Sequence, residues 1–269
     1  MNVINKILWR IRYLKAHLSH KLKLYTYKPE RYRGSFTNDP IRLEKSLVKR
    51  DFKKRVYCFW TGDNKMSENR LSCLQSMHQN IGVEVILITP TNLSEFILPE
   101  YPLHEAYEYL SLVHKSDYLR CYFMHHYGGG YADIKMYNKS WIEAFRKVTS
   151  DNEAFVLGYQ EVGEYGVPKI PGLIGRDIKK YFPYLLGNGA FIYKSNTPLT
   201  MQWYSELHKR LDNNLLRLKE RPGNILDANS GYPLKWSYLL GEILHPLLLK
   251  YHKHILQCDD VKPSFKNYR

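Results

Sequence analysis

The sequence predicts an α/β fold built on an open sheet. Two short apolar runs, residues 55–60 and 83–88, have the length and composition of buried strands. Between them we expect a helix over residues 67–79, because Ser67 is a suitable N-cap. This strand–helix–strand order indicates parallel pairing through a right-handed crossover. Ligands of such sheets bind beyond the carboxyl ends of the strands, so residues 60–64 form a candidate site.

The remainder of the chain adds elements in a less regular order. They are expected at residues 111–127 (helix), 131–136 (strand), 188–193 (strand), 198–211 (helix) and 234–249 (helix). The run Gly128–Gly130 ends the first of these helices, and Pro198 suits the first turn of the next. Pro246 is expected to bend or interrupt the last helix. This order fits an open α/β sheet.

The chain length and the cysteine content limit the class of protein further. A chain of 269 residues with 44% apolar residues can form one large globular domain or two small ones. Its four cysteines are scattered, without a CxxC pair, at positions 58, 73, 121 and 258. We expect reduced, buried thiols in a cytosolic protein, and a structural zinc site is disfavoured.

The positive charge is concentrated at the N-terminus. Residues 1–55 carry 16 Lys or Arg and 4 Asp or Glu, whereas the other 214 residues are nearly balanced. We therefore divide the chain into a basic arm and linker, residues 1–50, and an α/β domain, residues 51–269. The segment 25–51 is polar, contains two prolines and a glycine, and is interpreted as the linker.

The arm begins with a basic amphipathic helix. Its apolar residues recur at spacings of three and four: Ile4, Ile7, Leu8, Ile11, Leu14, Leu18 and Leu22. Charges interrupt every apolar run, so the segment is too short to span a bilayer and lacks the apolar core of a signal peptide. One interpretation places it on an anionic membrane surface. The other docks it on its own domain, with the apolar stripe as core.

The segment from His114 to Lys135 contains the groups most suited to chemistry. Asp117 and Arg120 are three residues apart on a predicted helix and share one face. A turn of three glycines follows, which lets the backbone approach a ligand closely. Tyr131, Asp133 and Lys135 then alternate along the next strand and share one side of it. Carboxylates that bind sugar hydroxyls or a cation, beside cations that bind a diphosphate, suit sugar-nucleotide chemistry.

These motifs resemble those of family 32-type glycosyltransferases, which contain a DXD motif and include bacterial capsule and O-antigen sugar transferases. The resemblance is carried by Ser116-Asp117…Arg120 followed by Tyr127-Gly-Gly-Gly-Tyr131-Ala-Asp133, within about 22 residues. Looser similarity is found at Phe59–Gly62, Asn188–Phe191 and Ser230–Pro233. The resemblance implies a GT-A-like single Rossmann-type domain with a mixed central sheet. It also implies transfer from a nucleoside diphosphate sugar with retention of configuration.

The resemblance assigns roles to individual residues. Those expected in catalysis are Asp117, Arg120, Asp133 and Lys135. Those expected to bind the nucleotide or donor sugar are Trp60, Thr61, Gly62, Ser116, Asp117, Arg120, Gly129, Gly130, Tyr131 and Asn188. Asp133 is the expected metal ligand. A simple surface ion pair between Asp117 and Arg120 is the structural alternative.

One departure from the family concerns the cofactor. Lys135 replaces the second acid of the DXD motif, and an ammonium group cannot ligate Mn²⁺ or Mg²⁺. Three outcomes are open. Other groups, such as Asp227 or His245, complete a metal site; Lys135 itself neutralises the diphosphate; or the site is inactive.

Other conspicuous side chains have simpler interpretations. His125 and His126 are adjacent on a helix and therefore do not face each other as a metal pair would. Trp236 and Tyr238 are expected in the core or in the wall of an acceptor groove.

The sequence therefore predicts a glycosyltransferase of surface polysaccharide synthesis. Its donor is a UDP-sugar, with GDP as the alternative nucleotide, and its acceptor is a glycan or lipid-linked glycan. We expect a cytoplasmic protein, peripheral on the inner face of the cell membrane. The alternatives are a non-catalytic glycosyltransferase-like scaffold and, less favoured, a nucleic-acid-binding protein. The main domain has no basic excess, so no nucleic-acid partner is expected. A nucleotidyltransferase is disfavoured because residues 60–64 lack a glycine-rich phosphate loop.

Overall fold

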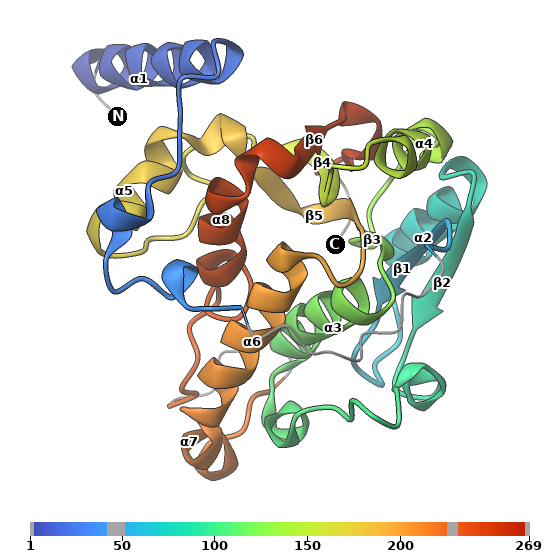
Figure 1. Cartoon of the computed structure of the whole chain (residues 1–269). Helices are drawn as coiled ribbons and strands as arrows, with labels where there is room; N and C mark the ends of the chain where they lie inside the picture. The colour runs from blue at the N-terminus through green and yellow to red at the C-terminus, as the bar shows by residue number, and fades with distance from the viewer. Residues whose placement is uncertain (1–2, 42–51, 225–230, 267–269) are drawn as a thin grey trace.

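A mixed six-stranded sheet forms the centre of the protein. The computed structural model describes residues 3–41, 52–224 and 231–266 (Figure 1). The strands are β1 (Arg55–Phe59), β2 (Glu84–Ile88), β3 (Gly129–Ala132), β4 (Val156–Gln160), β5 (Leu186–Tyr193) and β6 (Ile255–Gln257), in the order β2-β1-β3-β5-β4-β6. β1 pairs in parallel with β2 and β3, whereas β5 is antiparallel to β3 and β4. The predicted α/β fold with a mixed sheet is confirmed.

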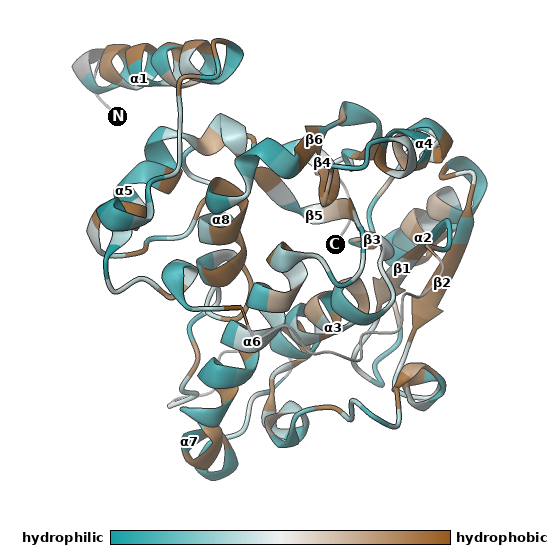
Figure 2. Cartoon of the chain, viewed as in Figure 1, coloured by the Kyte–Doolittle hydropathy of each residue, from teal (hydrophilic) through white to brown (hydrophobic). Residues whose placement is uncertain are grey.

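Helices cover both faces of this sheet. The helices of the described residues are α1 (Val3–Lys21), α2 (Glu68–Asn80), α3 (Leu112–His126), α4 (Ile142–Ser150), α5 (Gly172–Lys180), α6 (Pro198–Asp212), α7 (Leu215–Glu220) and α8 (Gly241–Lys250), of which α1 lies apart from the sheet (Figure 1). Strand residues alternate between two cores. In β1, Tyr57 and Phe59 pack with α3, α6 and α8, whereas Val56 and Cys58 pack with α2 and α4. Figure 2 shows the apolar residues of β2 and α8 in brown. All four cysteines are buried and unpaired, as predicted.

The β1–α2–β2 unit follows the prediction closely. β1 and β2 are parallel, with Arg55 opposite Glu84 and Phe59 opposite Ile88. The Ser67 side chain caps α2 by accepting a hydrogen bond from the backbone N–H of Arg70 at 3.3 Å. α3, β5 and α6 also lie where the sequence places them, within a few residues.

Two predicted boundaries were wrong. The strand expected at residues 131–136 is β3, which begins at Gly129 and ends at Ala132. Two of the three glycines therefore belong to the strand, where β3 packs closely on β1: a Cβ at Gly130 would lie 2.8 Å from Val56 Cγ2. The last helix, expected over residues 234–249, begins only at Gly241. Pro246 does not interrupt it, since this helix is buried on most sides and packing outweighs one lost backbone hydrogen bond.

The segment interpreted as a linker packs on the domain over its described part. Tyr25, Tyr32 and Thr37 are buried. Arg31 and Tyr32 both donate hydrogen bonds to Asp177 of α5, at 2.6 and 2.7 Å. Residues 42–51, which contain the expected domain boundary, lie outside the described residues, and the division at residue 50 stays a prediction.

Helix α1 docks on the domain, but its apolar stripe is not the contact. The contacts come from the opposite face, where Tyr13 and His17 pack against the ring of Phe182 and Ala16 is buried. The stripe residues from Ile7 to Leu22 are all exposed, from 43% for Ile11 to 67% for Leu14. The side chain of Ile4 lies outside the description. The interpretation in which the stripe serves as core is therefore wrong. No helix in the described part of the chain is both long and apolar enough to cross a bilayer.

Candidate donor site at the carboxyl ends of β1 and β3

An open cleft of about 470 Å³ lies where β1 and β3 end and α3 begins. This is the edge at which ligands of α/β sheets bind. The lining residues are Phe59, Trp60, Thr61, Gly62, Asn64, Arg70, Leu112, Val113, Ser116, Arg120, Tyr131, Asp133, Ile134, Lys135 and Trp236. Eight of the predicted site residues are among them. The structure thus brings together the loop after β1, one face of α3 and the chain after β3.

The loop after β1 is held against the start of α3. The backbone N–H of Trp60 donates to Ile88 O at 2.9 Å and so continues the β1–β2 pairing. The Thr61 hydroxyl donates to Leu112 O at 2.7 Å. A Cβ at Gly62 would lie 2.5 Å from Leu112 Cδ1, so a larger residue here would displace the Leu112 side chain. These contacts form one wall of the cleft.

Asp133 is the centre of the charged cluster. Its Oδ1 accepts hydrogen bonds from Arg120 Nη2 at 3.0 Å and from the Tyr131 hydroxyl at 2.7 Å. Its Oδ2 accepts one from Lys135 Nζ at 2.7 Å. β3 ends before Asp133, yet the three alternating side chains, Tyr131, Asp133 and Lys135, still converge as predicted. Both carboxylate oxygens are therefore occupied by donors.

Arg120 connects α3 to this cluster. Its Nη1 donates to Asp117 Oδ1 at 2.6 Å, and its guanidinium carbon lies 4.5 Å from the centre of the Tyr131 ring. The shared helix face predicted for Asp117 and Arg120 is confirmed. Asp117 is only 3% exposed and does not line the cleft, so it lies behind Arg120 and orients the guanidinium. The simple surface pair is excluded by this burial.

The neighbouring groups keep Asp133 and Arg120 in their charged forms. Burial disfavours the ionised form of Asp133, but Arg120 and Lys135 outweigh it, so the pKa of Asp133 is lowered. Burial likewise opposes the charge of Arg120, yet Tyr131 and the two carboxylates raise its pKa above the usual value. The lining contains three basic side chains, Arg70, Arg120 and Lys135, and one carboxylate. Such a site is suited to an anionic ligand.

Besides Asp117, three predicted binding residues do not line the cleft. Gly129 and Gly130 lie inside β3, next to Arg55 and Val56 of β1, and they serve the close packing of the sheet. Asn188 lies in β5, one residue before Gly189, which accepts from the Asp133 N–H. The Oδ1 atom of Asn188 is buried and has no hydrogen-bond partner among the described residues.

Arg70 and Trp236 are two of the seven lining residues that were not assigned to the donor site from sequence. Arg70, in the first turn of α2, donates to Ile134 O at 2.5 Å. It follows the β1 loop closely along the chain, and this position is the signal that could have identified it. Trp236 is 65% exposed at the cleft and not in the core. His114 holds this segment in place, through a 2.9 Å hydrogen bond with the Tyr232 hydroxyl and a 3.1 Å bond to Lys235 O.

The described residues do not fit a divalent cation. Asp133 is hydrogen-bonded to two cations, and no group of three or more His, Cys, Asp or Glu side chains forms a metal cluster within the described ranges. His245 does not line the cleft; it is fully buried, and its Nε2 lies 3.6 Å from Glu161 Oε2. Asp227, the other expected contributor, and Ser230 lie outside the described residues.

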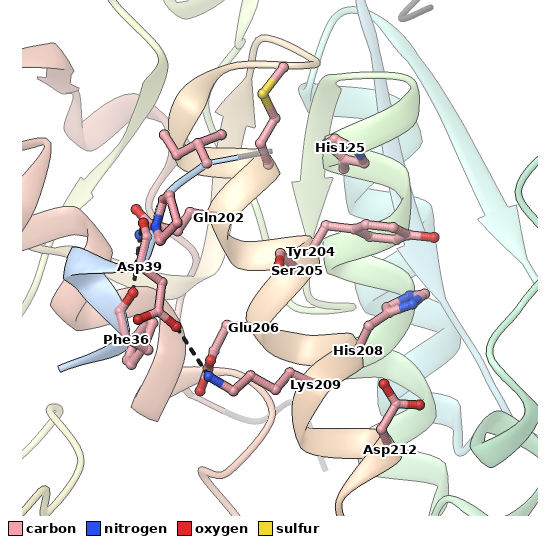
Figure 3. Close-up of a pocket in the computed structure, with 13 residues that line it drawn as sticks. Phe36, Asp39, His125, Gln202, Tyr204, Ser205, Glu206, His208, Lys209 and Asp212 are labelled. Carbon is pink, nitrogen blue, oxygen red and sulfur yellow. Dashed lines mark hydrogen bonds and ion pairs between the residues drawn. The ribbon is translucent and has the colours of Figure 1, made fainter. Parts of the chain in front are cut away.

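A second cavity lies beside α6 and contains none of the predicted site residues (Figure 3). His125 projects into it and stacks on Tyr204, with ring centres 4.7 Å apart. Burial lowers the pKa of His125 to about 4, so this histidine is neutral at pH 7. His126 is also buried and packs between tyrosine rings. The two adjacent histidines are therefore packing residues.

The protein is thus a mixed α/β sheet with a basic cleft at the carboxyl ends of two parallel strands, a site suited to an anionic ligand. A family model described as capsular polysaccharide synthesis protein matches residues 11–166, which is more than half of the chain. The chain belongs to this family. The matched region includes the whole segment from His114 to Lys135.

Other comparisons are more distant. No curated protein sequence matches the chain. Among solved structures, the chain is similar to the apo structure of the bifunctional glycosyltransferase WbbM, with 11% sequence identity and a TM-score of 0.38. The similarity covers 81% of this chain and 43% of that one, so this chain spans less than half of the WbbM chain. Membership of the family 32 type stays a prediction.

Proposed function

We propose that this protein is a glycosyltransferase of capsular polysaccharide synthesis. It transfers a sugar from a nucleoside diphosphate sugar, with UDP favoured, to a glycan or lipid-linked glycan. The observation that carries the proposal is the cluster at the sheet edge, where Asp133 is held by Arg120, Tyr131 and Lys135. Membership of the capsular polysaccharide synthesis family supports it.

Each charged group then has a role in the transfer. Lys135 and Arg120 bind the diphosphate and stabilise the negative charge that develops as it departs. Asp133 accepts hydrogen bonds from hydroxyls of the donor sugar. An acceptor hydroxyl attacks the anomeric carbon, the bond from that carbon to the diphosphate oxygen breaks, and the hydroxyl proton passes to the departing phosphate. Retention of configuration is proposed from the family resemblance alone.

The proposed donor site works without a divalent cation. Lys135 stands where the family 32-type enzymes that the motif resembles have a second acid, and an ammonium group supplies the diphosphate with a counter-charge but cannot ligate a metal ion. The 2.7 Å bond from Lys135 to Asp133 supports this role, because the lysine is already directed into the cleft. When the donor is bound, the Lys135 ammonium group donates hydrogen bonds to phosphate oxygens, either in addition to the Asp133 carboxylate or in its place.

We also propose that the enzyme acts at the inner face of the cell membrane. A lipid-linked acceptor is confined to a bilayer, so an enzyme that extends it gains from being held there. The exposed apolar stripe of α1 supports this location.

A thermal-shift screen tests the donor assignment. UDP, GDP, CMP and their sugars are each added with Mn²⁺, with Mg²⁺ or with EDTA. A ligand at about 100 times its Kd stabilises the native state by about 2.7 kcal/mol, which raises Tm by roughly 5–10 °C in a chain of this size. We expect a nucleoside diphosphate sugar to give this shift in EDTA.

The other outcomes discriminate among the alternatives. A shift that requires Mn²⁺ or Mg²⁺ would refute the metal-free site and leave the transferase proposal intact. If no nucleotide shifts Tm under any condition, the donor assignment is wrong and a non-catalytic scaffold becomes the better description.

A further inference from the structure

The exposed face of α1 is an apolar surface without a partner among the described residues. Six aliphatic side chains on it and just after it are 43–67% exposed: Ile7, Leu8, Ile11, Leu14, Leu18 and Leu22. Apolar and polar residues alternate along this helix in Figure 2. A protein surface in contact with water rarely exposes a contiguous apolar stripe of this length.

The opposite face of α1 is fixed to the domain. The Tyr184 hydroxyl donates to Ser19 O at 2.7 Å, and His20 packs edge-on against the Tyr184 ring. Arg12 also forms an ion pair with Glu164 at 3.5 Å. These contacts hold α1 on the domain so that its apolar stripe faces away from the domain.

Basic residues border the stripe. α1 and the two residues after it contain six Lys or Arg, all exposed, and no acid: Lys6, Arg10, Arg12, Lys15, Lys21 and Lys23. Helix α5, which faces α1 across a groove, adds Arg176, Lys179 and Lys180. On the helix, Arg10 and Lys21 lie to one side of the stripe and Arg12 to the other, while Lys15 lies within the stripe, near the edge on the side of Arg12.

The groove between α1 and α5 has a volume of about 610 Å³. Its floor is apolar and includes Trp9, Tyr13 and Phe182, while Lys15, Arg176 and Lys179 contribute positive charge. This combination matches a phospholipid, whose phosphate meets cations and whose upper acyl carbons meet aromatic side chains.

We propose that the α1–α5 face is a docking surface for an anionic phospholipid bilayer. α1 lies in the plane of the membrane surface, between the lipids and the domain, with its stripe among the acyl chains. The bordering lysines and arginines contact lipid phosphates, and the groove accommodates a headgroup. A second copy of the chain is disfavoured as occupant, because it would bring the same positive charges against these.

Co-sedimentation of the full chain with phosphatidylcholine vesicles, with and without phosphatidylglycerol, tests this surface. We expect binding to the phosphatidylglycerol vesicles only. Leu14→Gln/Leu18→Gln should weaken binding at least about tenfold, because two apolar side chains leave the acyl region. Lys179→Gln/Lys180→Gln should weaken it roughly 30-fold, from about a fivefold loss per cation.

Matched controls change the same residue types elsewhere. Leu71→Gln/Leu216→Gln alters two leucines that are 53% and 75% exposed on α2 and α7, and it should bind as the parent does. Lys54→Gln/Lys262→Gln alters two exposed lysines and should do the same. Thermal melts confirm that each variant folds.

Three results would overturn the inference. They are no binding of the parent to phosphatidylglycerol vesicles, parent-like binding by the Leu14/Leu18 variant, and a parent that is a dimer which this variant dissociates. The reason for membrane docking rests on the proposed function, whereas the vesicle-binding test does not depend on that function. Nucleotide-induced thermal shifts should be unchanged in all four variants, so failure of vesicle binding and failure of donor binding are separate outcomes.

Discussion

Lys135 donates a 2.7 Å hydrogen bond to Asp133, so the position expected to hold a second acid holds the counter-charge of the first. Arg120 binds the other oxygen of the same carboxylate. The cluster is thereby assembled before any ligand enters the cleft.

Replacing Lys135 tests the counter-charge directly. Lys135→Gln should weaken binding of the nucleoside diphosphate in EDTA about 10- to 100-fold, the value of a hydrogen bond to a charged group. Lys65→Gln is the control, since Lys65 is an exposed lysine just beyond the cleft loop and should leave Kd unchanged. The Kd is measured by calorimetry. Equal affinities for the parent and Lys135→Gln would contradict the assignment.

Arg120 should be important for stability as well as binding. Arg120→Met leaves Asp117 and Asp133 without their shared guanidinium, and a broken buried ion pair costs about 3–5 kcal/mol. Arg146→Met is the control, because its ion pair with Glu143 is exposed and should contribute less than about 1 kcal/mol. Urea unfolding monitored by circular dichroism gives both values. A loss below about 1 kcal/mol for Arg120→Met would show that the cluster is not a structural unit.

The buried pair of Glu161 and His245 predicts a pH dependence that appears only in variants. Burial raises the pKa of Glu161 to about 7 and lowers that of His245 to about 4. Between pH 4.5 and 6.5 the folded pair holds one proton, on Glu161, and the unfolded pair holds one, on His245. The proton counts are equal, so in the parent the two effects cancel.

Replacing either residue of the pair removes one of the two opposing pKa shifts. In Glu161→Gln the unfolded state binds the extra proton, so the free energy of unfolding should rise with pH between 4 and 6.5. In His245→Gln the folded state binds it, so the free energy of unfolding should fall as pH rises from 4.5 to 7. Each change should reach roughly 3 kcal/mol. Urea unfolding at a series of pH values measures it, and two profiles parallel to that of the parent would refute the assignment of protons.

Gly129 is expected to act through packing and not through the donor. Its φ is +88°, and a Cβ would lie 3.0 Å from Arg55 O, so Gly129→Ala should cost about 1–3 kcal/mol. Gly172→Ala is the control, since its φ is +79° but no atom lies within 4 Å of the added Cβ, and its cost should be smaller. Tm gives the order of stability. Donor affinity of the folded Gly129→Ala protein should match the parent, and a loss of affinity would restore Gly129 to the donor site.

Much of the sheet edge could be predicted because its signals are local. The apolar run of β1, the Ser67 cap and the glycines after α3 each determine a nearby boundary. The alternation of Tyr131, Asp133 and Lys135 likewise predicted the cluster. β4 and α5 were not anticipated, since β4 mixes glycine and glutamine with apolar residues, and α5 begins with glycine.

Other features depend on long-range contacts that local patterns do not contain. Arg31 lies in a polar segment that looks like a linker, and only the fold brings it to Asp177. The exposure of the α1 stripe could not be predicted either, because periodicity defines an apolar face but does not show what covers that face. Trp236 reaches the cleft only because His114 binds the segment before it.

The most direct test of the central claim is the release of nucleoside diphosphate from sugar nucleotides, measured in EDTA with a capsular glycan acceptor. We expect acceptor-dependent release by the parent and its loss in Lys135→Gln. Absence of release from every donor, by a protein that still binds nucleotide, would contradict the transferase assignment and indicate a scaffold.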